Sequence, residues 1–159
     1  MDVLAVVIPA HKPDFFRAAL ESVVAQTDKR FRVYVGDDGG PPEIERICAS
    51  FSSSGVDIVY RRFEENLGRH SLTAHWNRCV ALSREPWVWL FSDDDEMAPD
   101  CVASIHGELS RGRGGDVLRF NTDVIDGRGK TLVVNAAHPE VEAGVDFLYA
   151  RLRGERNSY

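Results

Sequence analysis

Two kinds of apolar pattern alternate along the first two thirds of the chain. Continuous β-branched and apolar runs predict buried strands at Val3–Pro9, Phe31–Val35, Val56–Arg61 and Trp87–Phe91. Between them, apolar residues recur at helical spacing, which predicts helices that begin after a capping Asp14, at about Glu43, at Ser71 and at Pro99. Strands that are apolar throughout and joined by helical crossovers imply an α/β fold, with a mostly parallel Rossmann-like sheet and helices on both faces.

The pattern changes after the glycine- and arginine-rich stretch Arg111–Gly115. Val117–Ile125 and Lys130–Ala136 flank an Asp-Gly turn sequence that starts at Asp126, which predicts a β-hairpin. Val145–Leu152 predicts a short last helix. A length of 159 residues suits one domain. We therefore expect residues 1–159 to form a single domain.

Composition and charge exclude several classes of partner. The formal net charge is −6 and the basic residues are scattered, which argues against binding to nucleic acid or to a membrane surface. No apolar stretch reaches the ~20 residues of a transmembrane helix. The N-terminal sequence has no signal-peptide pattern. The 3 cysteines lack the spacing of a zinc site or a disulfide framework. We expect a cytoplasmic protein with no transmembrane segment in this chain.

Polar residues follow the carboxyl end of every expected strand. The strands lead into Pro9–Lys12, Asp37–Asp38, Arg61–Arg62 and Asp93–Asp95 in turn. Ligands of open α/β sheets bind outside the carboxyl ends of the strands. Two acidic clusters and a few basic groups are therefore expected to converge on one edge of the sheet.

Asp93, Asp94 and Asp95 are the most informative of these residues. Three adjacent carboxylates repel one another and are unfavourable at the edge of a core, and a divalent cation with oxygen ligands would compensate them. Residues two apart in an extended segment point the same way, so Asp93 and Asp95 can face one cation that keeps positions open for phosphate oxygens. The alternative is a polar turn in which one aspartate, or Asp100, caps the next helix.

Asp37 and Asp38 leave two interpretations open. They fit a glycine-rich turn, because Asp and Gly are common turn residues. They also fit a binding site in which a carboxylate accepts hydrogen bonds from a ligand, while Gly39 and Gly40 allow close approach of the backbone. His70 and His75 lie near each other, and we interpret neither as a metal ligand.

Three segments, in this order, resemble the GT-A-fold glycosyltransferases of family two, the large inverting group. VVIPAHKP at Val6–Pro13 looks like the opening strand of that family, and VYVGDDGG at Val33–Gly40 looks like its V-D-D-G-S segment. The stretch Glu65–Asp100 looks like its N-x-G, A-x-N and strand-D-x-D progression.

The resemblance implies a nucleotide-diphosphate sugar donor, with UDP as the nucleotide expected from the family, and metal-assisted transfer with inversion to the hydroxyl of a glycan or another acceptor. By position, it places Pro9 and His11 by the base and ribose, Asp38 with Asp37 at the base, and Arg62 or Arg69 by the base or phosphate. It places Asp93 at the ribose or sugar, it makes Asp95, together with Asp93, a ligand of Mn²⁺ or Mg²⁺, and it includes Asp94 among the substrate-binding residues.

The sequence departs from the family pattern at two points. Gly39–Gly40 followed by two prolines replaces the usual G-S-x-D. An inverting transferase also needs a general base, which that family takes from an E-D motif in its acceptor half. The acidic residues after Asp126 include no such pair, and they are Glu140, Glu142, Asp146 and Glu155. We therefore identify no general base and expect the donor-binding portion of a longer enzyme, truncated before its acceptor-binding part.

Two other classes stay open at this stage. A non-catalytic module that binds a nucleotide sugar would keep the same site without a base. A metal-dependent phosphotransfer domain also carries acidic residues at strand ends, but it would require an aspartate after the first strand or a phospho-acceptor after the third. The residues there are Pro9-Ala10-His11 and Arg61-Arg62.

Overall fold

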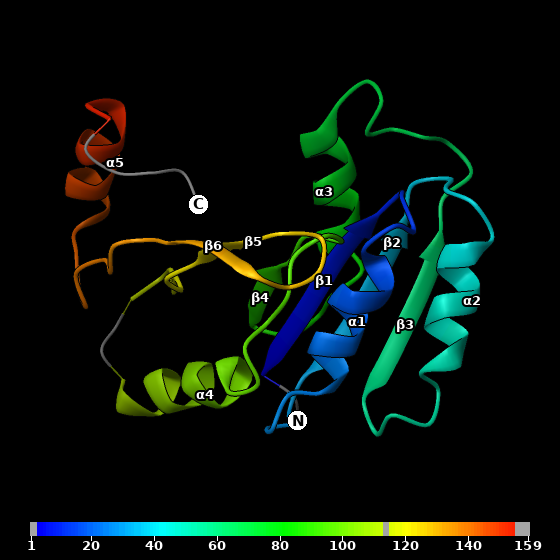
Figure 1. Cartoon of the computed structure of the whole chain (residues 1–159), viewed down its shortest axis with the longest axis horizontal. Helices are drawn as coiled ribbons and strands as arrows, with labels where there is room; N and C mark the ends of the chain where they lie inside the picture. The colour runs from blue at the N-terminus through cyan, green and yellow to red at the C-terminus, as the bar shows by residue number, and fades with distance from the viewer. Residues whose placement is uncertain (1–2, 113–114, 155–159) are drawn as a thin grey trace. The chain divides into compact units, whose positions relative to one another are not determined.

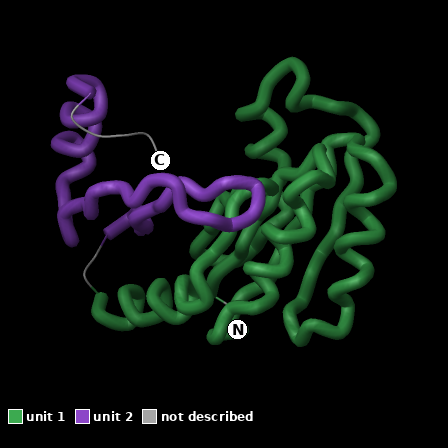
Figure 2. The backbone as a smooth tube through the Cα atoms, in the orientation of Figure 1, with its two compact units in different colours: residues 1–114 green, residues 115–159 purple. Residues whose placement is uncertain are grey.

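The computed structural model describes residues 3–112 and 115–154 and divides the chain into two compact units. Figure 2 colours them separately, residues 1–114 as the first unit and 115–159 as the second. None of the described helices is long and apolar enough to cross a membrane.

The first unit is built on a parallel sheet. Its 4 strands are ordered β3-β2-β1-β4 and every neighbouring pair is parallel. The strands are β1 (Leu4–Ala10), β2 (Arg32–Asp37), β3 (Asp57–Arg62) and β4 (Trp87–Leu90). The helices that alternate with them are α1 (Phe16–Val24), α2 (Glu43–Ser50), α3 (Leu72–Val80) and α4 (Cys101–Arg111) (Figure 1). The expected order of strands and helices is confirmed, and the elements differ from expectation only at their ends.

Helices cover both faces of this sheet, as expected. On one face, Ala5, Val7 and Tyr34 pack with Cys79 of α3 in one buried cluster. Side chains alternate along a strand, so Val6 and Val33, which are register partners, point to the opposite face. Helices α1 and α2 lie on that side, next to each other (Figure 1). Their buried residues are Phe16, Ala19, Leu20, Val23, Ile44, Ile47 and Cys48.

Two of the expected helix caps are wrong. Helix α1 begins one residue later than a cap at Asp14 requires: the N-cap position falls on Phe15, and no side chain bonds to the free N–H groups there. Asp100 does occupy the N-cap position of α4, but its side chain makes no capping hydrogen bond. Only α3 has the cap expected for its residue type, because Ser71 Oγ accepts a hydrogen bond from Ala74 N at 3.2 Å.

The second unit contains the hairpin and helix that the sequence predicts. Strands β5 (Asp123–Ile125) and β6 (Thr131–Val134) pair antiparallel, and helix α5 (Gly144–Leu152) follows. The Asp126 carboxylate closes the turn by accepting hydrogen bonds from Arg128 N and Lys130 N at 2.9 and 3.0 Å. This contact explains why aspartate suits the first position of the turn.

Candidate functional site

The carboxyl edge of the sheet in the first unit contains a topological switch point. Strand β1 pairs with β2 on one side and with β4 on the other. The chain leaves β1 toward β2 and β3 and returns to the far side of β1 to form β4. The strand order therefore reverses between β1 and β4, which is the position where open α/β sheets bind ligands.

His11 connects three of the loops at this edge. Its backbone N–H donates to Asp93 Oδ2 at 3.1 Å, which ties the loop after β1 to the acidic segment after β4. Its ring Nε2 lies 3.3 Å from the amide nitrogen of Asn66, in the loop after β3. An amide nitrogen can only donate, so the imidazole accepts this bond. Residues 11, 66 and 93, which are far apart in the sequence, are thus adjacent, as the strand-end argument predicts.

The acidic segment Ser92–Glu96 places four carboxylates in succession, those of Asp93, Asp94, Asp95 and Glu96. Partial desolvation and the neighbouring carboxylates raise the pKa of both Asp93 and Asp95 above the usual value of 3.8. The hydrogen bond from His11 opposes this shift at Asp93. Asp94 is exposed and accepts a hydrogen bond from the Ser92 hydroxyl. This segment therefore favours the approach of a cation.

The carboxylates of Asp93 and Asp95 suit a cation that takes its other ligands from a bound substrate. Among residues 3–112 and 115–154, no group of three or more His, Cys, Asp and Glu side chains could enclose a metal ion. Asp93 and Asp95 would supply carboxylate oxygens only, which suits Mn²⁺ or Mg²⁺. Mg²⁺ commonly binds through one or two carboxylates and completes its octahedron with water and phosphate oxygens.

Asp37 is completely buried and bonds to protein donors on three sides. Its Oδ1 accepts from Gly40 N at 2.7 Å. Its Oδ2 accepts from Tyr60 Oη at 2.6 Å and from Arg62 Nη1 at 2.9 Å. Arg62, which we expected near a phosphate or base, also donates to Gly40 O at 2.7 Å. These bonds hold the ends of β2 and β3 together.

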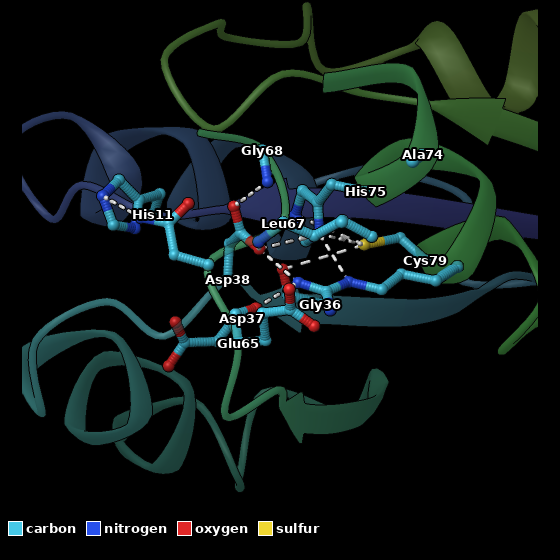
Figure 3. A network of polar contacts seen from close by, with 12 residues as sticks. His11, Gly36, Asp37, Asp38, Glu65, Leu67, Gly68, Ala74, His75 and Cys79 are labelled. Carbon is cyan, nitrogen blue, oxygen red and sulfur yellow. Dashed lines mark hydrogen bonds and ion pairs between the residues drawn. The ribbon is translucent and has the colours of Figure 1, made fainter. Parts of the chain in front are cut away.

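Asp38 is 2% exposed and fixes the loop that carries Asn66. Its two carboxylate oxygens accept from Leu67 N and from Gly68 N, both at 2.8 Å. Arg78 of α3 forms an ion pair with the same carboxylate. Figure 3 shows the carboxylate beside Leu67 and Gly68, and His75 Nδ1 lies 3.4 Å from Asp38 Oδ1. The prediction that Asp38 contacts the base stays a prediction.

Arg78 and His75 belong to this network, and the sequence did not single out either one for it. Arg78 donates through Nε to His75 Nδ1 at 3.0 Å and through Nη2 to Glu65 O at 2.8 Å, and its guanidinium lies 4.0 Å above the Phe63 ring. Burial lowers the pKa of His75, which agrees with a neutral ring that accepts a bond from Arg78. An arginine in a helix is usually a solvated residue, so no sequence signal marks this role.

The remaining predicted residues are placed as follows. Pro9 lies in β1 opposite Gly36 of β2. Arg69 is exposed, and its backbone N–H donates to Asn66 Oδ1 at 3.0 Å. The acidic residues considered for a general base, Glu140, Glu142 and Asp146, lie in the second unit, and Glu155 lies outside the described residues.

Gly68→Ala is expected to destabilise the protein because Asp38 leaves no room for a methyl group. A Cβ at this position would lie 2.5 Å from Asp38 Oδ2. We expect a loss of about 1–3 kcal/mol in the free energy of unfolding. The control is Gly107→Ala in α4, where a Cβ meets nothing within 4 Å. That change should stabilise the protein by about 0.5–1 kcal/mol. Urea unfolding of both variants measures the difference, and equal effects would contradict the close contact.

A parallel α/β sheet with polar loops at its switch point defines the class of open α/β proteins that bind ligands at the carboxyl ends of their strands. Within that class, residues 5–142 match the model of Glycosyl transferase family 2, and the chain belongs to this family. The chain is also 27% identical over 109 residues to glycosyltransferase GlyA from Streptococcus pneumoniae serotype 4 (strain ATCC BAA-334 / TIGR4). That alignment covers 68% of this chain and 15% of GlyA.

Two solved structures share the fold. TarS 1-349 from S. aureus, in complex with UDP, matches with a TM-score of 0.62 and 16% identity over 73% of this chain and 38% of that chain. Mannosyltransferase PcManGT from Pyrobaculum calidifontis, in complex with GDP-Man and Mn²⁺, matches with a TM-score of 0.58 and 14% identity. It covers 68% of this chain and 32% of that chain. These similarities show a GT-A-type fold, as the sequence predicts.

Proposed function

We propose that this chain binds a nucleotide-diphosphate sugar and forms the donor-binding part of an inverting glycosyltransferase. The observation that carries this proposal is the hydrogen bond between His11 N and Asp93 Oδ2 at 3.1 Å. It brings the acidic segment to the loop after β1, at the switch point of a family 2 chain. A UDP-linked donor is favoured by the TarS structures, which contain UDP or UDP-GlcNAc.

The residues at this edge contact different parts of the donor. Asp95, with Asp93, would hold a divalent cation, which would supply positive charge for the diphosphate. Pro9 and His11 line the place of the base and ribose, and Asp94 lies beside the sugar. The exposed Arg69 and the half-exposed Arg62 provide positive charge for phosphate. Asp37 and Asp38 border the base and hold the loops around it through their bonds to Arg62 and to Leu67–Gly68.

A bound Mn²⁺ or Mg²⁺ would act as a Lewis acid that stabilises the departing diphosphate. The chain's own residues keep the donor in place so that an acceptor hydroxyl can attack the anomeric carbon from the opposite face. Removal of the hydroxyl proton requires a general base. We propose that the acceptor-binding part of a longer protein supplies this base.

A non-catalytic nucleotide-sugar-binding module is the second candidate function. The acidic residues after Asp126 favour it, because they include no E-D pair that could act as the general base of a transferase. The phosphotransfer alternative is disfavoured by membership of family 2 and by Arg61–Arg62 at the end of β3.

Isothermal titration calorimetry with UDP, GDP and dTDP, each with and without Mn²⁺, tests the proposed function. We expect Mn²⁺ to strengthen the binding of UDP by about tenfold or more, because a cation held by Asp93 and Asp95 would offset the negative charge of the diphosphate. EDTA should reverse this gain. If none of the three nucleotides binds more tightly with Mn²⁺, the proposal is wrong. A donor-hydrolysis assay then separates transferase from module, since binding without turnover supports the module.

A further inference from the structure

The turn that carries Asp93–Asp95 is held at both ends by the rest of the first unit. On the side of β4, Phe91 N donates to Val7 O at 2.9 Å. On the other side, Met97 N donates to Ser22 Oγ of α1 at 3.0 Å. Only residues 92–96 lie between these two fixed points, so the second anchor limits where Asp95 can lie.

Gln26 provides the central part of the second anchor. It follows α1, and its side chain is completely buried. Its Nε2 donates to Ala98 O at 2.8 Å and to Ser22 O at 3.2 Å, and its Oε1 accepts from Val102 N at 3.0 Å. Both amide protons and the carbonyl oxygen are therefore bonded.

The neighbours of Gln26 extend the same contact. Thr27 N donates to Pro99 O at 2.9 Å. With the bonds from Ser22 and Gln26, the backbone of Met97, Ala98, Pro99 and Val102 is bonded to residues 22–27. We call these bonds the α1 anchor. They fix the backbone of the segment that joins the acidic turn to α4.

The acidic turn needs such an anchor, because its three carboxylates repel one another. A loosely held turn would relax by moving its aspartates apart, and two carboxylates that must share one cation lose affinity when their separation changes. A buried amide is suited to resist this motion, since breaking its bonds leaves buried polar groups unpaired.

We propose that Gln26, supported by Ser22, is a positioning residue that sets the geometry of Asp93 and Asp95 for cation-dependent nucleotide binding. The inference rests on the proposed function of this site. Gln26 touches neither nucleotide nor cation and acts only through the backbone of residues 97–102.

Two pairs of variants test the α1 anchor. Gln26→Glu keeps the shape of the side chain and its acceptor for Val102 N but replaces the two N–H donors by an oxygen facing Ala98 O. Ser22→Ala removes the acceptor for Met97 N, whereas Ser22→Thr keeps the hydroxyl. His106→Leu is the matched control: His106 Nε2 donates to Arg30 O at 2.9 Å, which joins α4 to the segment after α1 away from the acidic turn.

The readouts are UDP affinity with and without Mn²⁺, the Tm, and hydrogen exchange of the Met97 and Val102 amides. We expect Gln26→Glu and Ser22→Ala to weaken UDP binding in Mn²⁺ by about 10–100-fold, as other indirect supports of metal ligands do. Affinity without Mn²⁺ should stay unchanged, and amide exchange should become faster. Ser22→Thr and His106→Leu should keep the Mn²⁺-dependent gain in UDP affinity, even if their Tm values change.

The outcomes separate the two proposals. If the unchanged protein gains no nucleotide affinity from Mn²⁺, the proposed function fails and this inference fails with it. If the unchanged protein gains affinity, and Gln26→Glu and Ser22→Ala gain it equally, only the positioning role is wrong. If His106→Leu loses the gain to the same extent as Gln26→Glu, the loss reflects general destabilisation, which also overturns the positioning role.

Discussion

Asp95→Asn is expected to abolish the Mn²⁺-dependent part of UDP binding and, at the same time, to raise the Tm of the metal-free protein at neutral pH. The first effect follows from loss of a carboxylate that binds the cation. The second follows from the raised pKa of Asp95, caused by partial desolvation and by the charges of Asp94 and Asp93. A variant that is more stable but does not bind cannot be explained by misfolding.

The gain in stability should depend on pH in a defined direction. The pKa of Asp95 is higher in the folded protein than its usual value of 3.8, so the ionised carboxylate destabilises the fold at pH values above the folded pKa. This penalty decreases as the pH falls through the folded pKa, and it is absent below the usual value. The Tm difference between Asp95→Asn and the unchanged protein should therefore be largest near pH 7 and vanish below about pH 4.

Glu96→Gln is the matched control for Asp95→Asn, because it removes one charge from the neighbouring, exposed position. It should keep most of the Mn²⁺-dependent gain in UDP affinity. Thermal unfolding from pH 3.5 to 7.5 and calorimetry with Mn²⁺ measure the two effects. Metal-dependent binding that survives in Asp95→Asn would refute the assignment of Asp95 as a cation ligand.

Asp38→Ala should cause the largest loss of stability of the changes considered for this site. The substitution leaves Leu67 N and Gly68 N without their acceptor and leaves Arg78, whose side chain is 21% exposed, without its carboxylate. Removing one partner of a buried ion pair typically costs about 3–5 kcal/mol in the free energy of unfolding.

Asp57→Ala serves as the control for Asp38→Ala. Asp57 pairs with Arg32 at 2.8 Å, and its side chain is 57% exposed, so its loss should cost at most about 1 kcal/mol. Guanidinium unfolding of the two variants measures the contrast. A similar small loss for both would mean that Asp38 does not hold the loop after β3.

The fold could be predicted from the sequence because its signals are local. The runs at Val3–Pro9 and Trp87–Phe91 are apolar throughout, and such runs become strands of a parallel sheet covered on both faces. The location of the site at one edge could then be predicted too, since parallel strands place their carboxyl ends on the same edge of the sheet. The cap at Asp14 could not be predicted in the same way, because the helix start shifts by one residue without changing the apolar pattern.

The candidate site could be predicted only in part. The three adjacent aspartates at positions 93–95 could be recognised from their charge. For Asp37 and Asp38, the sequence did not decide between a role in a turn and a role in ligand binding. Their environment depends on donors from other elements, such as Tyr60 and Arg78. Gln26 was missed for the same reason, because its partners Ala98 and Val102 are separated from it by most of the first unit.

The pairing of β1 with β4 also has a consequence for the order in which the chain folds. Leu4 pairs with Trp87, so this step must close a loop that contains β2 and β3, whereas β1 with β2 and β2 with β3 pair over shorter stretches. Closing a longer loop costs more entropy, and contacts of high sequence separation form slowly. We therefore expect β4 to join the sheet last. The acidic turn, which follows β4 directly, would then take its position only in the final step of folding.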